Sequence, residues 1–320
     1  MRAVPELGIF LSSEDHRPSQ LAQTAQLAEQ SGFRSVMISD HFHPWTDRQG
    51  ESPFVWSVIG AIAATTKLRV VTGVTCPTFR IHPAIVAQAA ATSSLLLDGR
   101  FALGVGSGEA LNEHILGEHW PPAGVRLEKL EEAVDIMRQL WTGGWVNHHG
   151  RHFVVENARI YSCPDTPPSV YVSAFGPRAV GVAARIGDGL VTVTPDSDAA
   201  GRYRKEGGTG PLLGTVRVSF DPDESAARKL ACDVWRTVAV PGELNQELPM
   251  PAHFEQAAEL VTEDQVAESI PCGPDPERHA ASIRKYLDAG YDEVYVSHVG
   301  EDQSEFIRFL ASEVQPRLGL

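Results

Sequence analysis

The feature that most constrains the fold of this 320-residue chain is a regular alternation of short apolar segments with longer amphipathic ones. The apolar segments are rich in β-branched residues and show little polar alternation. This composition is typical of parallel strands that are buried on both faces of a sheet. We therefore expect eight strands, at residues 7–11, 35–38, 68–74, 101–106, 169–174, 189–194, 215–220 and 293–299.

The segments between these strands have the apolar spacing of helices. In the first one, Leu21, Ala25 and Ala28 recur at helical intervals, and Gly32 follows as a stop signal. The same reasoning applies along the chain. It predicts helices at residues 20–30, 54–65, 83–97, 125–141, 177–186, 224–236, 277–289 and 304–313.

Eight successive β-then-α units fit either a closed (β/α)8 TIM barrel or an open doubly wound sheet. The number of strands, the length of the chain and the absence of GxGxxG after the first strand favour the barrel. We expect one domain over residues 1–320, since no Ser/Gly-rich or Pro-rich linker divides the sequence. A β-hairpin insertion is predicted at about 145–157, and a lid-like insertion at about 195–270.

The charge and the cysteines limit the possible partners. The formal net charge is −14, which argues against nucleic acid or an anionic membrane as a partner. A small-molecule substrate remains, and an anionic ligand is still possible because helix N-termini bind phosphate whatever the net charge. The N-terminal stretch has the pattern of neither a signal peptide nor a membrane span. The four cysteines form no CxxC pair, which favours reduced thiols and a cytoplasmic location.

Polar clusters follow three successive strands. The stretch SDHFHPW (39–45) comes after the second strand, TCPT (75–78) after the third, and SGEALN (107–112) after the fourth. In a barrel the C-terminal ends of the strands form one rim, and this rim carries the active site. We therefore expect the three clusters to converge.

His41 is the best candidate for acid–base chemistry, because imidazole can take and give protons near neutral pH. Trp45 could form the wall of a site for a flat ring or could simply pack in the core. The glycines of the segment 104–113 could let backbone approach a planar ligand closely, with Glu109 and Asn112 facing it. Gly176 precedes Pro177 at a predicted helix start, which is a place that suits an anion.

Two other chemistries have weaker support. His148, His149 and His152 cluster, but on a predicted exposed hairpin, so we expect no metal site. A serine-nucleophile triad lacks its GxSxG signature.

Five segments together resemble the bacterial-luciferase-like superfamily: SDHFHPW (39–45), GVTCPTFR (73–80), GSGEALNEHILG (106–117), ENARIY (156–161) and ARIGDG (184–189). More narrowly, they resemble its oxidoreductases that use the deazaflavin coenzyme F420, in the branch of F420-dependent glucose-6-phosphate dehydrogenase. The resemblance runs from about residue 7 to residue 317.

This resemblance implies a TIM barrel with insertions, a homodimer, and a deazaflavin at the C-terminal rim. It implies a non-prolyl cis peptide at Gly73–Val74 behind the ring. Catalytic positions match His41, Trp45 and Glu109. The residues that match cofactor-binding positions are Asp40, Gly73, Val74, Cys76, Ser107, Glu109, Asn112 and Gly176.

The implied reaction is hydride transfer between F420 and a small organic substrate, either an alcohol or carbonyl or an activated alkene. His41 would take the hydroxyl proton, Trp45 would wall the pocket and stabilise developing charge, and Glu109 would manage a proton at the far side of the ring system.

The chain departs from the branch pattern where the glucose-6-phosphate enzyme has cationic phosphate ligands. Those positions are Asp196, Gln256 and Ser269 here, so we expect the cofactor to be kept and that substrate lost. Phe175 and Val193 replace smaller or polar residues. An FMN-dependent monooxygenase on the same barrel remains the alternative, and a non-catalytic cofactor carrier is a further one.

Overall fold

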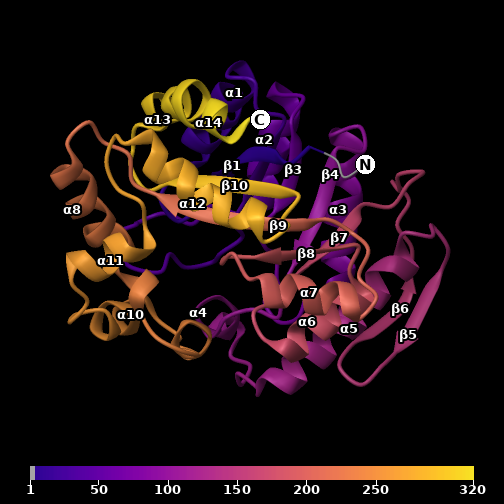
Figure 1. Cartoon of the computed structure of the whole chain (residues 1–320). Helices are drawn as coiled ribbons and strands as arrows, with labels where there is room; N and C mark the ends of the chain where they lie inside the picture. The colour runs from indigo at the N-terminus through magenta and orange to yellow at the C-terminus, as the bar shows by residue number, and fades with distance from the viewer. Residues whose placement is uncertain (1–3) are drawn as a thin grey trace.

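The computed structural model describes residues 4–320. Its centre is a closed barrel of eight parallel strands, which confirms the predicted (β/α)8 TIM barrel (Figure 1). The strands are β1 (Glu6–Leu11), β2 (Ser35–Ile38), β3 (Arg69–Thr72), β4 (Phe101–Val105), β7 (Ser169–Ser173), β8 (Gly189–Thr192), β9 (Leu212–Val218) and β10 (Glu293–His298). Around the barrel they follow the order β1-β10-β9-β8-β7-β4-β3-β2.

Helices surround the barrel. The helices that cover it are α1 (Pro18–Gln30), α2 (Val55–Thr65), α3 (Pro83–Leu96), α5 (Ala123–Leu140), α6 (Pro177–Ile186), α7 (Ser197–Lys205), α12 (Pro276–Asp288) and α13 (Gln303–Phe309). The chain ends with a π-helical turn at Leu310–Val314 and α14 (Gln315–Leu318). A short helix, α4 (Ala110–Glu113), follows β4 and runs into a 3-10 turn at His114–Leu116.

The strands carry two apolar layers because successive side chains point to opposite faces. One face packs on the helices and forms most of the core. The other fills the barrel interior with one cluster, whose members are Phe10, Met37, Val71, Ala102, Tyr171, Val191, Leu213 and Tyr295.

The N-terminal end of the barrel is closed by a polar network around Arg69. Its guanidinium donates to Glu293 at 2.6 Å and to the hydroxyls of Tyr295 and Tyr171 at 3.3 and 3.1 Å. The opposite end, where the strands finish, carries the polar loops and forms the barrel mouth.

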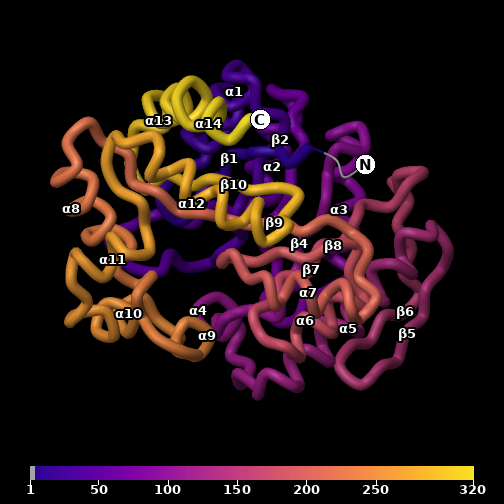
Figure 2. The backbone as a smooth tube through the Cα atoms, in the orientation of Figure 1, coloured from indigo at the N-terminus to yellow at the C-terminus, as the bar shows by residue number. Residues whose placement is uncertain are grey.

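Two insertions interrupt the alternation of strands and helices. Strands β5 (Val146–His149) and β6 (Val154–Ala158) pair antiparallel as a hairpin. The second insertion lies between β9 and α12 and stands beside the strand ends (Figure 2). It consists of α8 (Glu224–Trp235), a 3-10 turn at Arg236–Ala239, α9 (Leu244–Glu247), α10 (Pro251–Ala257) and α11 (Glu263–Ser269). We name residues 224–269 the insertion segment.

The predicted lid-like insertion at about 195–270 covers too many residues, because it includes a strand of the barrel. Strand β9 lies inside that range and pairs with both β8 and β10, so residues 212–218 belong to the barrel. The start of β9 was also misplaced, because Gly214 breaks the apolar run. A side chain at Gly214 would collide with the ring of Tyr286 on α12, which explains the glycine.

Two further properties concern the chain as a whole. Among residues 4–320, no helix is both long and apolar enough to cross a bilayer. All four cysteines are unpaired.

Candidate active site

The polar loops after β2, β3 and β4 meet at the mouth, as the strand order requires. Asn112 of α4 joins two of them. Its Oδ1 accepts the backbone N–H groups of Phe42 and His43 at 2.9 and 3.1 Å. Its amide nitrogen lies 3.5 Å from Glu109 Oε2. Since Asn112 is buried, it holds the His41 loop and the Glu109 loop in a fixed relation.

His41 is supported by a carboxylate from the loop after β1. Its Nδ1 lies 3.4 Å from Glu14 Oε1. The Glu14 carboxylate also accepts the hydroxyls of Ser12 at 2.9 Å and Ser39 at 2.7 Å. Burial opposes ionisation of Glu14, but His41 and the two serine hydroxyls outweigh it, and the pKa of Glu14 is lowered. The imidazole therefore sits against an ionised carboxylate.

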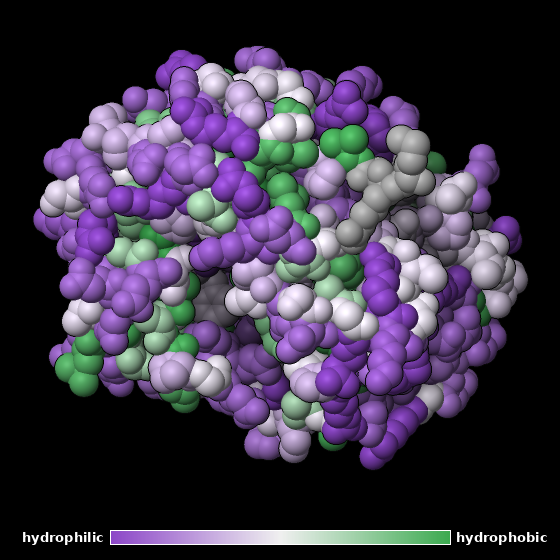
Figure 3. Space-filling model, viewed as in Figure 1, coloured by the Kyte–Doolittle hydropathy of each residue, from purple (hydrophilic) through white to green (hydrophobic). Residues whose placement is uncertain are grey.

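Trp45 lies beside this imidazole. The two ring centroids are 5.1 Å apart and tilted by 55°. The other side of Trp45 packs edge-on against Phe254 of the insertion segment, at 5.2 Å. Trp45 thus connects the His41 loop to the insertion segment and can wall a site between them. The surface is hollowed between the insertion segment and the rest of the barrel (Figure 3).

Asp40 points away from His41, into a buried network below the loops. It accepts the Thr75 hydroxyl at 2.7 Å and an Arg80 N–H at 2.8 Å. The backbone N–H of Arg80 donates to Glu113 at 2.8 Å. Burial raises the pKa of Glu113 to about 7, although Arg80 acts in the opposite direction. These groups join the loops after β2, β3 and β4 from beneath.

The Gly-rich loop after β4 passes close to the loop after β3. A side chain at Gly108, where φ is +84°, would lie 2.7 Å from Cys76 Sγ. One at Gly106 would lie 2.8 Å from Val74. Cys76 is itself buried with its sulfur 2.8 Å from the Thr78 hydroxyl, and burial raises the pKa of its thiol well above the ordinary value. Only small residues therefore allow these loops to meet.

The ends of β3 and β4 leave part of their backbone exposed at the mouth. Gly73 and Val74 are joined by a cis peptide bond, as the resemblance implies, and both are partly exposed. Ser107 and Glu109 are also partly exposed and lie on the neighbouring strand end. A flat backbone wall with a hydroxyl and a carboxylate at its edge suits a heterocycle that is apolar on its face and polar on its rim.

The next two strand ends extend this surface. Gly176 follows β7 and begins α6, with Pro177 at the first helical position. A side chain at Gly176 would meet nothing within 4 Å, so the approach to this helix start is open. Phe175 and Val193 are exposed at 53 and 50%. They add an apolar wall beside a helix start that suits a phosphate.

Asp196, Gln256 and Ser269, which stand where the resemblance implies cationic phosphate ligands, carry no positive charge. Asp196 caps α7 by accepting the N–H of Ala199 at 2.8 Å. Gln256 lies in α10 and Ser269 ends α11. None of these side chains can form an ion pair with a phosphate.

The hairpin histidines are paired with glutamates. His148 Nε2 lies 3.1 Å from Glu132 and His149 Nε2 lies 3.1 Å from Glu156. His152 Nε2 lies 3.5 Å from Glu128. Among residues 4–320, no group of three or more His, Cys, Asp or Glu residues is arranged to hold a metal ion.

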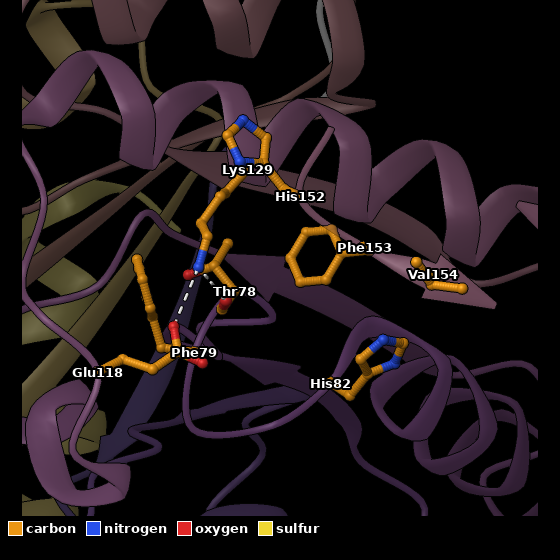
Figure 4. Close-up of a pocket in the computed structure, with 8 residues that line it drawn as sticks. All are labelled: Thr78, Phe79, His82, Glu118, Lys129, His152, Phe153 and Val154. Atoms are coloured by element: carbon orange, nitrogen blue, oxygen red, sulfur yellow. Dashed lines mark hydrogen bonds and ion pairs between the residues drawn. The ribbon is translucent and has the colours of Figure 1, made fainter. Parts of the chain in front are cut away.

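A separate cavity of about 290 Å³ lies behind the loop after β3 (Figure 4). Lys129 of α5 reaches into it. Its ammonium lies 3.3 Å from Glu118, 3.4 Å from the Thr78 carbonyl and 3.7 Å from the centre of the Phe79 ring. Because the protein itself satisfies this cation, the cavity adds nothing to the chemistry of the mouth.

Sequence reasoning missed three residues of the site: Glu14, Arg80 and Glu113. A signal existed for Glu14, since it belongs to a polar run, SSED (12–15), that directly follows the first strand. Arg80 and Glu113 lie one turn or less beyond the predicted clusters, and nothing local distinguishes them from exposed charges.

The chain is similar to proteins of known family and structure. Residues 4–293 match the family model described as luciferase-like monooxygenase. The F420-dependent glucose-6-phosphate dehydrogenase of Microbacterium testaceum is 35% identical, over 97% of this chain and 96% of that protein. An F420-dependent secondary alcohol dehydrogenase, solved in complex with an F420-acetone adduct, superimposes with a TM-score of 0.90 at 31% identity, and 99% of each chain is covered.

A more distant structure shares the fold. The coenzyme F420-dependent tetrahydromethanopterin reductase of Methanopyrus kandleri has a TM-score of 0.79 at 22% identity, with 99% of this chain and 100% of that chain covered. The match of the family model over most of the chain, together with these relatives, shows that the chain belongs to the luciferase-like monooxygenase family.

Proposed function

We propose that this protein is a coenzyme F420-dependent oxidoreductase that acts on a small organic substrate. The observation that carries the proposal is the Glu14–His41 pair, which stands on the same rim as the flat surface at Val74 and Ser107. The relatives that cover nearly the whole chain are named for F420-dependent dehydrogenation, which supports the same cofactor here.

The cofactor would be held by the partly exposed groups at the ends of β3, β4 and β7, namely Gly73, Val74, Ser107, Glu109 and Gly176. Asp40, Cys76 and Asn112 are buried and would shape this surface from behind. When bound, a deazaflavin accepts or delivers a hydride and reacts poorly with oxygen.

The chain's own residues would manage protons and position the substrate. Nε2 of His41 takes the proton of a substrate hydroxyl, while Nδ1 is held by Glu14 Oε1 at 3.4 Å and by the His43 carbonyl at 3.3 Å. Trp45 walls the pocket beside the imidazole and favours the positive charge that the imidazole then carries. Glu109, on the other loop, takes or gives a proton at the polar edge of the ring site. In the opposite direction the same groups reduce a carbonyl or an activated alkene.

The substrate is not glucose 6-phosphate in this proposal, although relatives bear that name. A sugar phosphate would meet Asp196 instead of a cation, and Gln256 and Ser269 carry no charge. A negative charge near the phosphate would weaken binding rather than support it.

The alternative is an FMN-dependent monooxygenase, since the matching family model is described as luciferase-like monooxygenase. FMN and F420 share the ring shape and a phosphate, so the barrel fold alone does not distinguish them. Titration of the purified protein with each cofactor, followed by measurement of oxygen uptake, separates them. Tight FMN binding with oxygen consumption would replace our proposal.

We also propose that the protein works as a homodimer in the cytoplasm, as the resemblance implies. Helix α3 leaves Ile85, Leu95 and Leu96 exposed, which gives it an apolar surface that a second copy could cover. Light scattering coupled to size exclusion tests this, and a monomeric mass would contradict it.

The central experiment is His41→Gln. We expect alcohol oxidation to fall about 10²- to 10⁴-fold, which is the usual contribution of a general base, while F420 affinity stays within about twofold. His149→Gln is the matched control, because this exposed histidine lies on the hairpin. Unchanged turnover in His41→Gln would remove the residue from the mechanism.

A further inference from the structure

Arg217 is a cationic residue inside the barrel mouth. It lies on β9 in the alternating series that contains Leu213, whose side chain belongs to the barrel interior. It is also the next-to-last residue of the strand, so it stands at the C-terminal end. The loops of the ring site follow β2, β3, β4 and β7, whereas β9 and its neighbour β10 lie across the barrel. Arg217 therefore faces the half of the mouth that a substrate would occupy.

The guanidinium of Arg217 is held by stacking. It lies 3.3 Å from the ring centre of Trp235, a buried residue at the end of α8. The indole N–H of Trp235 donates to Asp15 Oδ2 at 3.1 Å, which fixes the plane of the ring. A guanidinium stacked in this way keeps its donors in the plane of the group and directed outward.

The donors of Arg217 have no partner in the described part of the chain. No hydrogen bond or ion pair within 4 Å reaches them from residues 4–320, and Nε is buried without an acceptor. The paired residue on β10 is Ser297, whose hydroxyl is buried and also lacks a partner. A buried donor left without a partner is unfavourable, and a ligand oxygen would relieve it.

The charges near Arg217 select the kind of oxygen. Glu14 and Asp15 act on its guanidinium. The pKa of Glu14 is lowered, and burial with the neighbouring Glu14 raises that of Asp15 to about 6, so both are ionised at pH 7. One cation thus faces two anions. A phosphate or carboxylate would add a third negative charge, whereas a neutral oxygen can accept the hydrogen bonds without repulsion.

We propose that Arg217 and Ser297 form a subsite for a neutral oxygen of the substrate, next to the carbon that reacts at His41. Trp235 stacks on Arg217 and donates to Asp15. The adjacent residue in the chain, Glu14, contacts His41, so Arg217 and His41 border the same part of the mouth. The substrate class is then a short vicinal diol or hydroxy ketone rather than a simple alcohol, a hydroxy acid or a sugar phosphate. This inference rests on the proposed oxidoreductase function.

The test compares matched alcohols with F420 as the cofactor. We expect kcat/KM for 2,3-butanediol to exceed that for 2-butanol by about tenfold or more, and lactate to be poorer than either. Arg217→Met removes the guanidinium and its donors and keeps an unbranched apolar side chain beside Trp235, so the ratio of diol to 2-butanol should fall to about one. Arg202→Met, an exposed arginine of α7, is the control and should keep the wild-type ratio.

Diol binding gives a second readout that does not need turnover. Ligand-observed NMR should detect 2,3-butanediol on the cofactor-loaded protein and not on Arg217→Met, whose thermal midpoint should show that it is folded. Equal ratios in wild type and variant, or a preference for lactate over the diol, would overturn the subsite. Turnover of 2-butanol without diol preference would contradict only the subsite, whereas lack of F420 binding would contradict the proposed function.

Discussion

The carboxylate of Glu14 and the imidazole of His41 approach to 3.4 Å, although they come from loops after different strands. The register of the two strands explains this short distance. Strands β1 and β2 are neighbours in the barrel, and Leu11 at the end of β1 lies opposite Ile38 at the end of β2. Ser39, directly after β2, donates its hydroxyl to the same carboxylate. The barrel thus positions a proton acceptor from two adjacent strand ends before any substrate enters.

This pair predicts the behaviour of Glu14→Gln. The amide keeps the shape of the carboxylate but cannot stabilise a protonated His41. We expect kcat to fall about 10- to 100-fold, less than for loss of the base itself, with little change in F420 affinity. The split between kcat and KM is the diagnostic readout. The fall should appear in kcat while KM stays within about twofold, and a kcat equal to that of wild type would show that Glu14 takes no part in the proton transfer.

The sequence was sufficient for the barrel, because the alternation of apolar and amphipathic segments is a local signal. His41, Trp45 and Glu109 follow strand ends and so lie on one rim, while their roles at a ring site stay a prediction. The supporting residues could not be predicted in this way. Arg217 reaches its surroundings through Trp235 of the insertion segment, and no spacing in the sequence encodes that contact.

The ion pair of Asp40 with Arg80 predicts a large stability effect. Both side chains are nearly buried, and Arg80→Met would leave the Asp40 carboxylate without its cation. We expect the free energy of unfolding to fall by about 3–5 kcal/mol in urea titration. The double variant Asp40→Asn/Arg80→Met should recover part of it, because no charge is then stranded.

Arg151→Met is the matched control for this pair. Arg151 bonds Glu128 at 2.6 Å but is largely exposed, so its loss should change stability by less than about 1 kcal/mol. A similar loss in the two single variants would mean that burial of the Asp40 pair has no special effect.

Glu113 predicts a pH dependence of stability. Burial raises its folded-state pKa to about 7, above the ordinary value of 4.5, so the folded protein binds this proton more tightly than the unfolded chain. The contribution is fully present below about pH 4.5 and is lost as the pH rises to about 7. Relative to Glu113→Gln, the wild type should lose up to about 3 kcal/mol over that range.

Urea unfolding at pH 5, 6, 7 and 8 measures this difference. Glu268→Gln, an exposed acid of α11, should show a constant difference from wild type. If the Glu113→Gln difference were equally constant, the carboxyl would titrate normally in the folded state.

The backbone conformation of Gly108 leads us to expect that a side chain there lowers the affinity for F420. Its φ of +84° is unfavourable for other residues, and an added Cβ would lie 2.7 Å from Cys76 Sγ and 2.9 Å from Glu113 Cγ. Gly108→Ala should therefore displace the loop of Ser107 and Glu109, and we expect F420 affinity to fall about tenfold or more in a fluorescence titration. Gly201→Ala is the control, since its Cβ on α7 would meet nothing within 4 Å; this change should leave affinity intact and raise stability by up to about 1 kcal/mol. Equal F420 affinity in the two variants would show that the close approach of these loops does not shape the ring site.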